Sequence, residues 1–230
     1  PGCFARTVAA ARAAAEVGLP FQMNTLVSDE TLHDLPAIYG IACDLGAARC
    51  SLFLLVSVGR GAVLNAITPE ACEQLFGWLA GAAIEGGPVV TTTEAPHFRR
   101  VVIQRRQREV GLNRRAAHPV HDHEAGIRDG NGIMFISYKG DVSPSGFLPL
   151  CAGNVRRDDP IDIYRSSPLF RALRDPDGFG GRCGACEFRW VCGGSRARAF
   201  AASGDPLAED PLCGFQPARR ERERGTFLAP

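Results

Sequence analysis

The chain has 230 residues, enough for one large domain or two smaller ones with a real hydrophobic core. Hydrophobic residues make up 45% and charged residues 22%, which is typical of globular proteins and excludes an intrinsically disordered chain. The longest apolar runs are too short to cross a membrane, so a transmembrane protein is excluded as well. The formal net charge of +1 argues against a dedicated nucleic-acid-binding protein.

The first 93 residues predict helices that alternate with strands. Thr68-Pro69-Glu70, for example, combines an N-cap residue, a proline at the first helical position and an acidic first turn. Three helices are expected at residues 4–17, 28–45 and 68–83, and three strands at residues 21–27, 50–58 and 88–93. This order predicts a parallel sheet with right-handed crossovers. Three parallel strands leave an open edge where earlier strands would pair, so we expect the chain to be part of a longer protein.

Residues 94–131 are rich in arginine and show little apolar periodicity, which predicts a basic linker or a segment that covers an active site. The arginines of residues 99–108 either contact an acidic substrate or form a solvated face. His97 belongs either to a substrate pocket or to the surface. Three further histidines either bind zinc or nickel or have no ligand: His118, His121 and His123.

A second unit is predicted from residue 132 onward. Residues 133–138 and 142–150 flank a Lys-Gly-Asp turn, as in a β-hairpin. Short helices are expected at residues 159–164, 167–173 and 195–202.

Four of the nine cysteines lie close together in this second unit. Cys183 and Cys186 form a Cys-x-x-Cys turn, and Cys192 and Cys213 follow. Such a turn directs two thiolates at one metal, and two further sulfurs complete a set that fits either zinc or an iron–sulfur cluster. Three arginines could offset the thiolate charge: Arg182, Arg189 and Arg196. The chain starts without a secretory leader, so we expect the reducing cytoplasm, where clustered cysteines bind metal more often than they form disulfides.

Four other cysteines lack pairing or metal spacing and are expected to be small buried hydrophobic residues: Cys3, Cys43, Cys50 and Cys72.

The cysteine-rich region carries a family resemblance. Residues 181–200, GRCGACEFRWVCGGSRARAF, and 203–213, SGDPLAEDPLC, resemble the C-terminal SPASM domain of radical S-adenosylmethionine (SAM) enzymes. The runs GDVSPSGFLP at 140–149 and IYRSSPLFRALR at 163–174 resemble the hairpin and spacer helices of that domain. The similarity is greatest to the enzymes of haem and haem d1 biosynthesis and to a related group of uncharacterised radical SAM/SPASM proteins.

The first part of the chain resembles the radical SAM partial barrel. LPFQMNTLV at 19–27 is similar to its fifth strand and FLLVSVGRG at 53–61 to its sixth. The resemblance implies an α/β fold, the C-terminal half of a parallel (β/α)6 partial barrel followed by a small α+β iron–sulfur SPASM domain. The strand ends of this family border SAM and substrate, so the resemblance implies that Asn24 and the turn at 58–61 lie on the cofactor side; otherwise Asn24 simply caps a strand end.

The implied domains are the partial barrel at 1–93, the basic segment at 94–131, the SPASM domain at 132–217 and a charged tail at 218–230.

The sequence departs from the family in one important respect. The Cys-x-x-x-Cys-x-x-Cys motif that holds the SAM-cleaving cluster does not occur in these residues. We therefore expect a C-terminal portion of the enzyme that does not cleave SAM by itself. Ser145 stands where the SPASM hairpin usually offers a cysteine, so we expect one auxiliary cluster, with Cys151 as a candidate ligand of a second.

In the intact family, a first cluster cleaves SAM to a deoxyadenosyl radical, which takes a hydrogen atom from the substrate. The resemblance implies that the four clustered cysteines hold an auxiliary 4Fe–4S cluster, which accepts or relays an electron or binds substrate. It further implies a peptide or tetrapyrrole substrate and an electron donor such as ferredoxin or flavodoxin, with no nucleic-acid or membrane partner. A zinc-stabilised interaction module without redox activity is the alternative.

Overall fold

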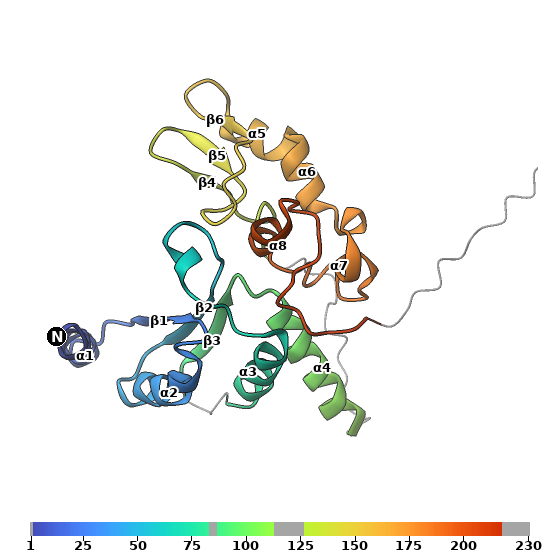
Figure 1. Cartoon of the computed structure of the whole chain (residues 1–230). Coiled ribbons are helices and arrows are strands. Elements are labelled where there is room, and N and C mark those ends of the chain that lie inside the picture. The colour runs from blue at the N-terminus through green and yellow to red at the C-terminus, as the bar shows by residue number, and fades with distance from the viewer. Residues whose placement is uncertain (1, 83–86, 113–126, 218–230) are drawn as a thin grey trace, which may run out of the picture.

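The computed structural model describes residues 2–82, 87–112 and 127–217, shown as coloured ribbon in Figure 1. The chain forms a mixed α/β fold that contains a three-stranded parallel sheet and a small three-stranded antiparallel sheet. The three histidines at 118, 121 and 123 and the charged tail at 218–230 lie outside the described residues.

The parallel sheet has the order β1-β2-β3, with β1 (Gln22–Val27), β2 (Arg49–Leu54) and β3 (Val89–Thr93). Its parallel arrangement confirms the prediction from the alternating helices and strands. β2 lies in the middle and is largely buried, because helices and loops cover both of its faces.

The helices of this unit follow the predicted order: α1 (Cys3–Glu16), α2 (Leu35–Asp44) and α3 (Pro69–Gly81), with short 3-10 turns η1 (Leu32–Asp34) and η2 (Gly59–Val63). α3 starts as its sequence predicts, since Oγ1 of Thr68 accepts a hydrogen bond from the N–H of Ala71 at 3.1 Å. α1 buries none of its residues and projects from the sheet at the side of β1 (Figure 1).

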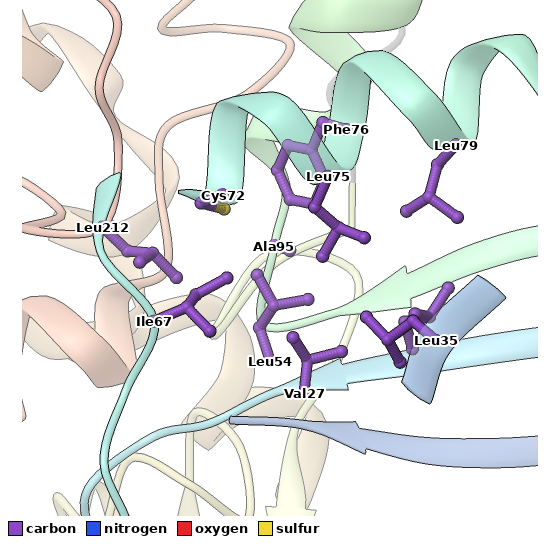
Figure 2. Close-up of a cluster of buried hydrophobic side chains, with 11 residues drawn as sticks. Val27, Leu35, Leu54, Ile67, Cys72, Leu75, Phe76, Leu79, Ala95 and Leu212 are labelled. Atoms are coloured by element: carbon purple, nitrogen blue, oxygen red, sulfur yellow. The ribbon is translucent and has the colours of Figure 1, made fainter. Parts of the chain in front are cut away.

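The main core lies between α3 and the parallel sheet. Figure 2 shows Phe76 and Leu79 of α3 above Val27 of β1 and Leu54 of β2. Leu212, from the C-terminal part of the chain, completes this cluster and is 5% exposed. The parallel-sheet unit and the C-terminal part of the chain therefore share one core.

A long helix, α4 (His97–Leu112), occupies the first part of the segment 94–131, for which the sequence predicted no regular element. Phe98 and Val101 pack against the core below α3, and Arg100 is buried and pairs with Glu73 of α3. Arg100, one of the arginines that obscured the helical pattern, therefore has a structural role.

The second unit begins with the predicted hairpin, here β4 (Phe135–Ile136) and β5 (Asp141–Ser143), to which β6 (Gly153–Asn154) adds a third antiparallel strand. The expected helices are α5 (Pro160–Ser166), α6 (Pro168–Arg174) and α8 (Arg196–Ser203). The 3-10 turn η3 (Pro176–Gly178) and the short helix α7 (Gly181–Ala185) were not predicted.

Among the described helices, none combines the length and the apolar character needed to cross a membrane.

Candidate metal centre

Four cysteines of the second unit line a single pocket, which we call the cysteine pocket: Cys183, Cys186, Cys192 and Cys213. Aromatic, glycine, proline, arginine and acidic residues form the rest of its wall: Phe188, Phe215, Gly193, Gly194, Pro217, Arg100, Arg182, Arg189 and Asp210. The structure therefore brings together the four cysteines that the sequence singled out.

Short local elements present the sulfurs to this pocket. Cys183 lies in α7 and Cys186 follows the last residue of that helix, so the two sulfurs are about one turn apart. Cys192 lies in the turn that leads into α8. Cys213 comes from the segment that runs from α8 back to the core below α3.

Each sulfur accepts a backbone N–H hydrogen bond. The pairs are Asp210 to Cys183, Phe188 to Cys186 and Gly194 to Cys192, each with 3.4 Å between nitrogen and sulfur, and Phe215 to Cys213. Such hydrogen bonds stabilise thiolates, which are the form that binds metal.

Two glycines let the backbone run close to the sulfurs. Gly193 and Gly194 have φ angles of +69° and +67°, a conformation that glycine adopts without strain. A Cβ on Gly194 would lie 2.6 Å from Nη2 of Arg196, 2.8 Å from Cβ of Asp210 and 3.1 Å from Sγ of Cys183. A side chain at position 194 therefore displaces Arg196 and Asp210, both of which donate hydrogen bonds to Cys183.

Burial favours the neutral form of three of the thiols. It raises the pKa of Cys186, the pKa of Cys192 and, to about 11, the pKa of Cys213. A thiolate at these positions lacks water, and a bound metal cation removes that penalty by replacing the proton.

Arg196 places a positive charge against this pocket. Its side chain is fully buried, and Nη2 lies 3.5 Å from Sγ of Cys183. Its other hydrogen bonds go to carbonyl oxygens of Gly194, Pro206 and Ala208, and no carboxylate in the described part of the chain forms an ion pair with it. A buried charge of this kind is costly without a negative partner, and thiolates supply one.

The two other arginines expected to offset thiolate charge are already paired with carboxylates. Arg182 Nη2 lies 3.1 Å from Oε1 of Glu209, and Arg189 Nε lies 2.6 Å from Oδ1 of Asp177. Their charges are therefore largely balanced without the sulfurs.

Asp210 holds the pocket to the neighbouring elements, a role that the sequence did not reveal. This buried carboxylate accepts hydrogen bonds from Nη1 of Arg198 at 3.0 and 3.2 Å and from the N–H groups of Ser195 and Leu212 at 2.8 and 3.0 Å. Burial alone would raise the pKa of Asp210, but the Arg198 guanidinium, His97 and these N–H groups outweigh it and lower that pKa.

The residues present offer a soft donor set. Within residues 2–82, 87–112 and 127–217, no three Cys, His, Asp or Glu side chains form a group that could hold one metal ion as they stand. The four sulfurs nevertheless line one pocket. Four thiolates fit either zinc or a 4Fe–4S cluster.

A larger hollow, which we call the cleft, has a volume of about 890 Å³. The C-terminal end of β3, one side of α4, residues 127–129 and residues 145–147, in the loop between β5 and β6, form its walls. Ligands of open α/β sheets bind at this end of the strands. The lining mixes apolar side chains such as Phe98 and Phe147 with charged ones that include Glu94, Arg99 and Asp129.

A single segment separates the cysteine pocket from the cleft. Val191 and Ser195 line the cleft, whereas Cys192, Gly193 and Gly194 between them line the cysteine pocket. The two hollows are thus divided by the thickness of one stretch of backbone.

Other residues singled out in the sequence lie outside both hollows. Asn24 is an exposed residue within β1, opposite Ser51 of β2, and its amide oxygen accepts a hydrogen bond from Gln22. Its assignment to the cofactor side stays a prediction. Cys151 is exposed, with its sulfur 3.4 Å from the carbonyl oxygen of Gly153.

The remaining cysteines only partly follow the expectation of burial. Cys50 and Cys72 are buried, Cys43 is half-buried, and Cys3 is exposed on α1. The expectation was wrong for Cys3 because α1 packs against nothing in the described part of the chain.

His97 is fully buried, so a surface position for it was wrong. Its Nε2 lies 3.3 Å from Sγ of Cys72, and its Nδ1 lies 3.9 Å from Oδ2 of Asp210. Burial lowers the pKa of His97 to about 4, so the ring is neutral at physiological pH. It is not among the residues that line the cleft.

Comparison with known proteins agrees with the resemblance seen in the sequence. No family model matches the chain. An AdoMet-dependent heme synthase of Methanosarcina barkeri is 37% identical over 223 residues, which cover 96% of this chain and 63% of that protein. The chain is a relative of the radical SAM/SPASM proteins. It spans less than two thirds of the length of this relative.

Solved structures share the fold of this chain. SuiB of Streptococcus suis bound to the precursor peptide SuiA gives a TM-score of 0.61 at 16% identity, over 91% of this chain and 48% of SuiB. SuiB bound to S-adenosylmethionine gives a TM-score of 0.60 at 14% identity over the same shares.

Proposed function

We propose that this chain carries the auxiliary-cluster part of a radical SAM/SPASM enzyme. In this proposal, residues 1–93 form the C-terminal half of the partial barrel, 94–131 a basic linker or a segment that covers the active site, 132–217 the SPASM domain, and 218–230 a charged tail. One auxiliary 4Fe–4S cluster is bound by Cys183, Cys186, Cys192 and Cys213.

The observation that carries this proposal is the cysteine pocket. Its four sulfurs surround one space, each accepts a backbone N–H, and one segment of backbone divides them from the cleft. A bound cluster supplies one-electron exchange. This position supports exchange with a molecule held in the cleft.

Each group around the pocket has a distinct task in this proposal. The thiolates hold the cluster, and the N–H groups together with Arg196 balance its negative charge. Phe188 and Phe215, whose rings pack edge to face with centroids 5.7 Å apart, exclude water from one side. Residues 191–195 set the distance between the cluster and the cleft.

The intact enzyme is proposed to modify a peptide or a tetrapyrrole-type substrate. Both are supported by relatives, since one is named a heme synthase and SuiB binds the peptide SuiA. Arg99 and Arg106 of α4 line the cleft and suit a substrate with acidic groups. We further propose that SAM lies on the side of Asn24 and that a ferredoxin or flavodoxin donates electrons.

SAM cleavage is proposed to require residues outside this sequence, because the Cys-x-x-x-Cys-x-x-Cys motif does not occur in its 230 residues.

Iron and sulfide analysis of the anaerobically reconstituted chain tests the cluster. We expect about four irons and four sulfides per chain, with a visible band that dithionite bleaches and an EPR signal after reduction. Changing any one of the four pocket cysteines to Ala removes most of the iron. Cys151→Ala is the matched control and retains full iron, because Cys151 lies outside the pocket.

Two results would contradict this function. Binding of one zinc without colour would make the unit a structural interaction module. Full iron in a Cys192→Ala protein would show that the ligands lie elsewhere.

A further inference from the structure

Two acidic side chains meet on the wall of the cleft, next to the start of α8. Glu94 follows β3, and Asp129 lies in a tight turn closed by a 2.8 Å hydrogen bond from the N–H of Asn131 to the carbonyl oxygen of Arg128. Oγ of Ser195 donates a hydrogen bond to Oε2 of Glu94. The N–H of Ala197 donates to Oδ2 of Asp129 at 2.9 Å.

One oxygen of this pair has no hydrogen-bond donor. Asp129 is only 4% exposed, and no described group donates to its Oδ1. The Glu94 carboxyl faces Asp129 within hydrogen-bonding reach. Two carboxylates have no proton to form that bond, and a buried acceptor without a donor is costly. A single proton on the pair provides the missing donor.

The surrounding charges do not neutralise both carboxylates. Nη2 of Arg198 donates to the backbone oxygen of Glu94 at 2.7 Å, but its guanidinium already forms two hydrogen bonds with Asp210. Arg128 is 5% exposed, and its Nε has no partner in the described part of the chain. Arg99 and Arg106 line the same cleft from α4. Burial and the facing Asp129 carboxylate raise the pKa of Glu94 to about 8.

The backbone at Glu94 is also unusual. Its φ angle is +56°, and among the described residues it is the single non-glycine residue with a positive φ. Such a conformation costs about 1 kcal/mol or more and concentrates at functional sites. Here it occurs where the chain leaves β3 and enters the wall of the cleft.

We propose that Glu94 and Asp129 share one proton and form the proton-exchange site of the cleft. In one direction the O–H bond of the pair breaks as a new O–H or N–H bond forms on the bound molecule, and both carboxylates are then negative, with Arg128 beside them. In the other direction an O–H or N–H of the bound molecule breaks and a carboxylate of the pair takes the proton. No electron moves in this step. It rests on the proposed function only for the identity of the bound molecule, a substrate that gains or loses a proton.

Infrared spectroscopy of the reconstituted chain tests the pair directly. At pH 7 we expect one C=O band of a protonated carboxyl group, lost as the pH rises through the range around 8. Glu94→Gln removes this band. Asp129→Asn moves its loss to lower pH, because an amide then donates to an ionised Glu94. Glu109→Gln, at an exposed carboxylate of α4, leaves the band unchanged and is the matched control.

Exchange into heavy water distinguishes a proton-exchange site from a structural acid. We expect the band to shift within the mixing time, because the pair faces the cleft, whereas a carboxyl sealed in the core exchanges slowly. Absence of the band at pH 7, its persistence in Glu94→Gln, or slow exchange would each overturn the inference. Iron content is measured on the same samples, so loss of the cluster and loss of the proton are separate results.

Discussion

Single atoms decide how closely the chain approaches the sulfurs. The backbone at Gly194 packs against Cys183 and Asp210 and donates its N–H to Cys192. Gly204 has a similar positive φ, +77°, where it ends α8, but a Cβ there would meet nothing within 4 Å. Substitutions at these two glycines therefore distinguish the effect of backbone strain from the effect of steric contact with the pocket.

Gly194→Ala is expected to lose most of the bound iron, because the new methyl group displaces Arg196 and Asp210, which donate hydrogen bonds to Cys183. Gly204→Ala is expected to lose about 1 kcal/mol of stability and to keep its iron, since only the backbone conformation is strained. Iron analysis and thermal unfolding of both proteins measure this difference. Equal iron loss in the two variants would contradict it.

At this scale the sequence revealed the pocket cysteines and the arginines near them, but not the buried carboxylates. A Cys-x-x-Cys turn is visible in a local pattern because its spacing alone brings the sulfurs together. Asp210 and the pair of Glu94 and Asp129 act through contacts with distant parts of the chain. No local pattern marks such a contact.

Among the elements, the best predicted were those with local signals at their ends. α3 begins at the expected Thr-Pro-Glu run, and α8 ends at a glycine in the left-handed conformation. α4 was missed because arginines occupy most of its faces, so its apolar stripe of Phe98 and Val101 is short. Its burial comes from contact with α3, which the sequence does not show.

Leu212 helps to anchor the segment that carries Cys213 to the first unit. Leu212→Ala is expected to lower the free energy of unfolding of the reconstituted protein by about 2–5 kcal/mol, since it opens a cavity beside Ile67 and Cys72 (Figure 2). Leu19→Ala, at a position that is 60% exposed, is the matched control and changes little. Denaturant unfolding measures both, and equal effects would show that Leu212 is not a core residue.

The whole molecule is predicted to lose stability as the pH rises, through Glu94. Its pKa is raised from 4.5 to about 8 on folding, so the folded protein holds more protons than the unfolded chain between these values. The stabilisation is complete below pH 4.5 and falls by up to about 1.4 kcal/mol per pH unit until pH 8. Folding lowers the pKa of His97 from 6.5 to about 4, so between these values the unfolded chain holds more protons than the folded protein. In that range His97 makes the protein more stable as the pH rises.

Denaturant unfolding between pH 6.5 and 8 measures the effect of Glu94 with little contribution from His97. The difference in unfolding free energy between the native protein and Glu94→Gln should change steadily over this interval, in favour of the variant at higher pH. A difference that is independent of pH would contradict the raised pKa of Glu94.

For the molecule as a whole, the sequence predicted the parallel sheet, since alternating helices and strands permit few topologies. It did not show that Leu212 belongs to the first core, or that residues 191–195 face two hollows. Both features depend on how the second unit folds back onto the first.

The shared wall at residues 191–195 also constrains how such a protein can diversify. A substitution at Val191 or Ser195 that reshapes the cleft for a new molecule also moves the backbone next to Cys192. The shape of the cleft and the surroundings of the pocket sulfurs are therefore inherited together along this stretch. A lineage that changes one must also adjust the other, or must reshape the cleft from the loop at 145–147, which does not line the cysteine pocket.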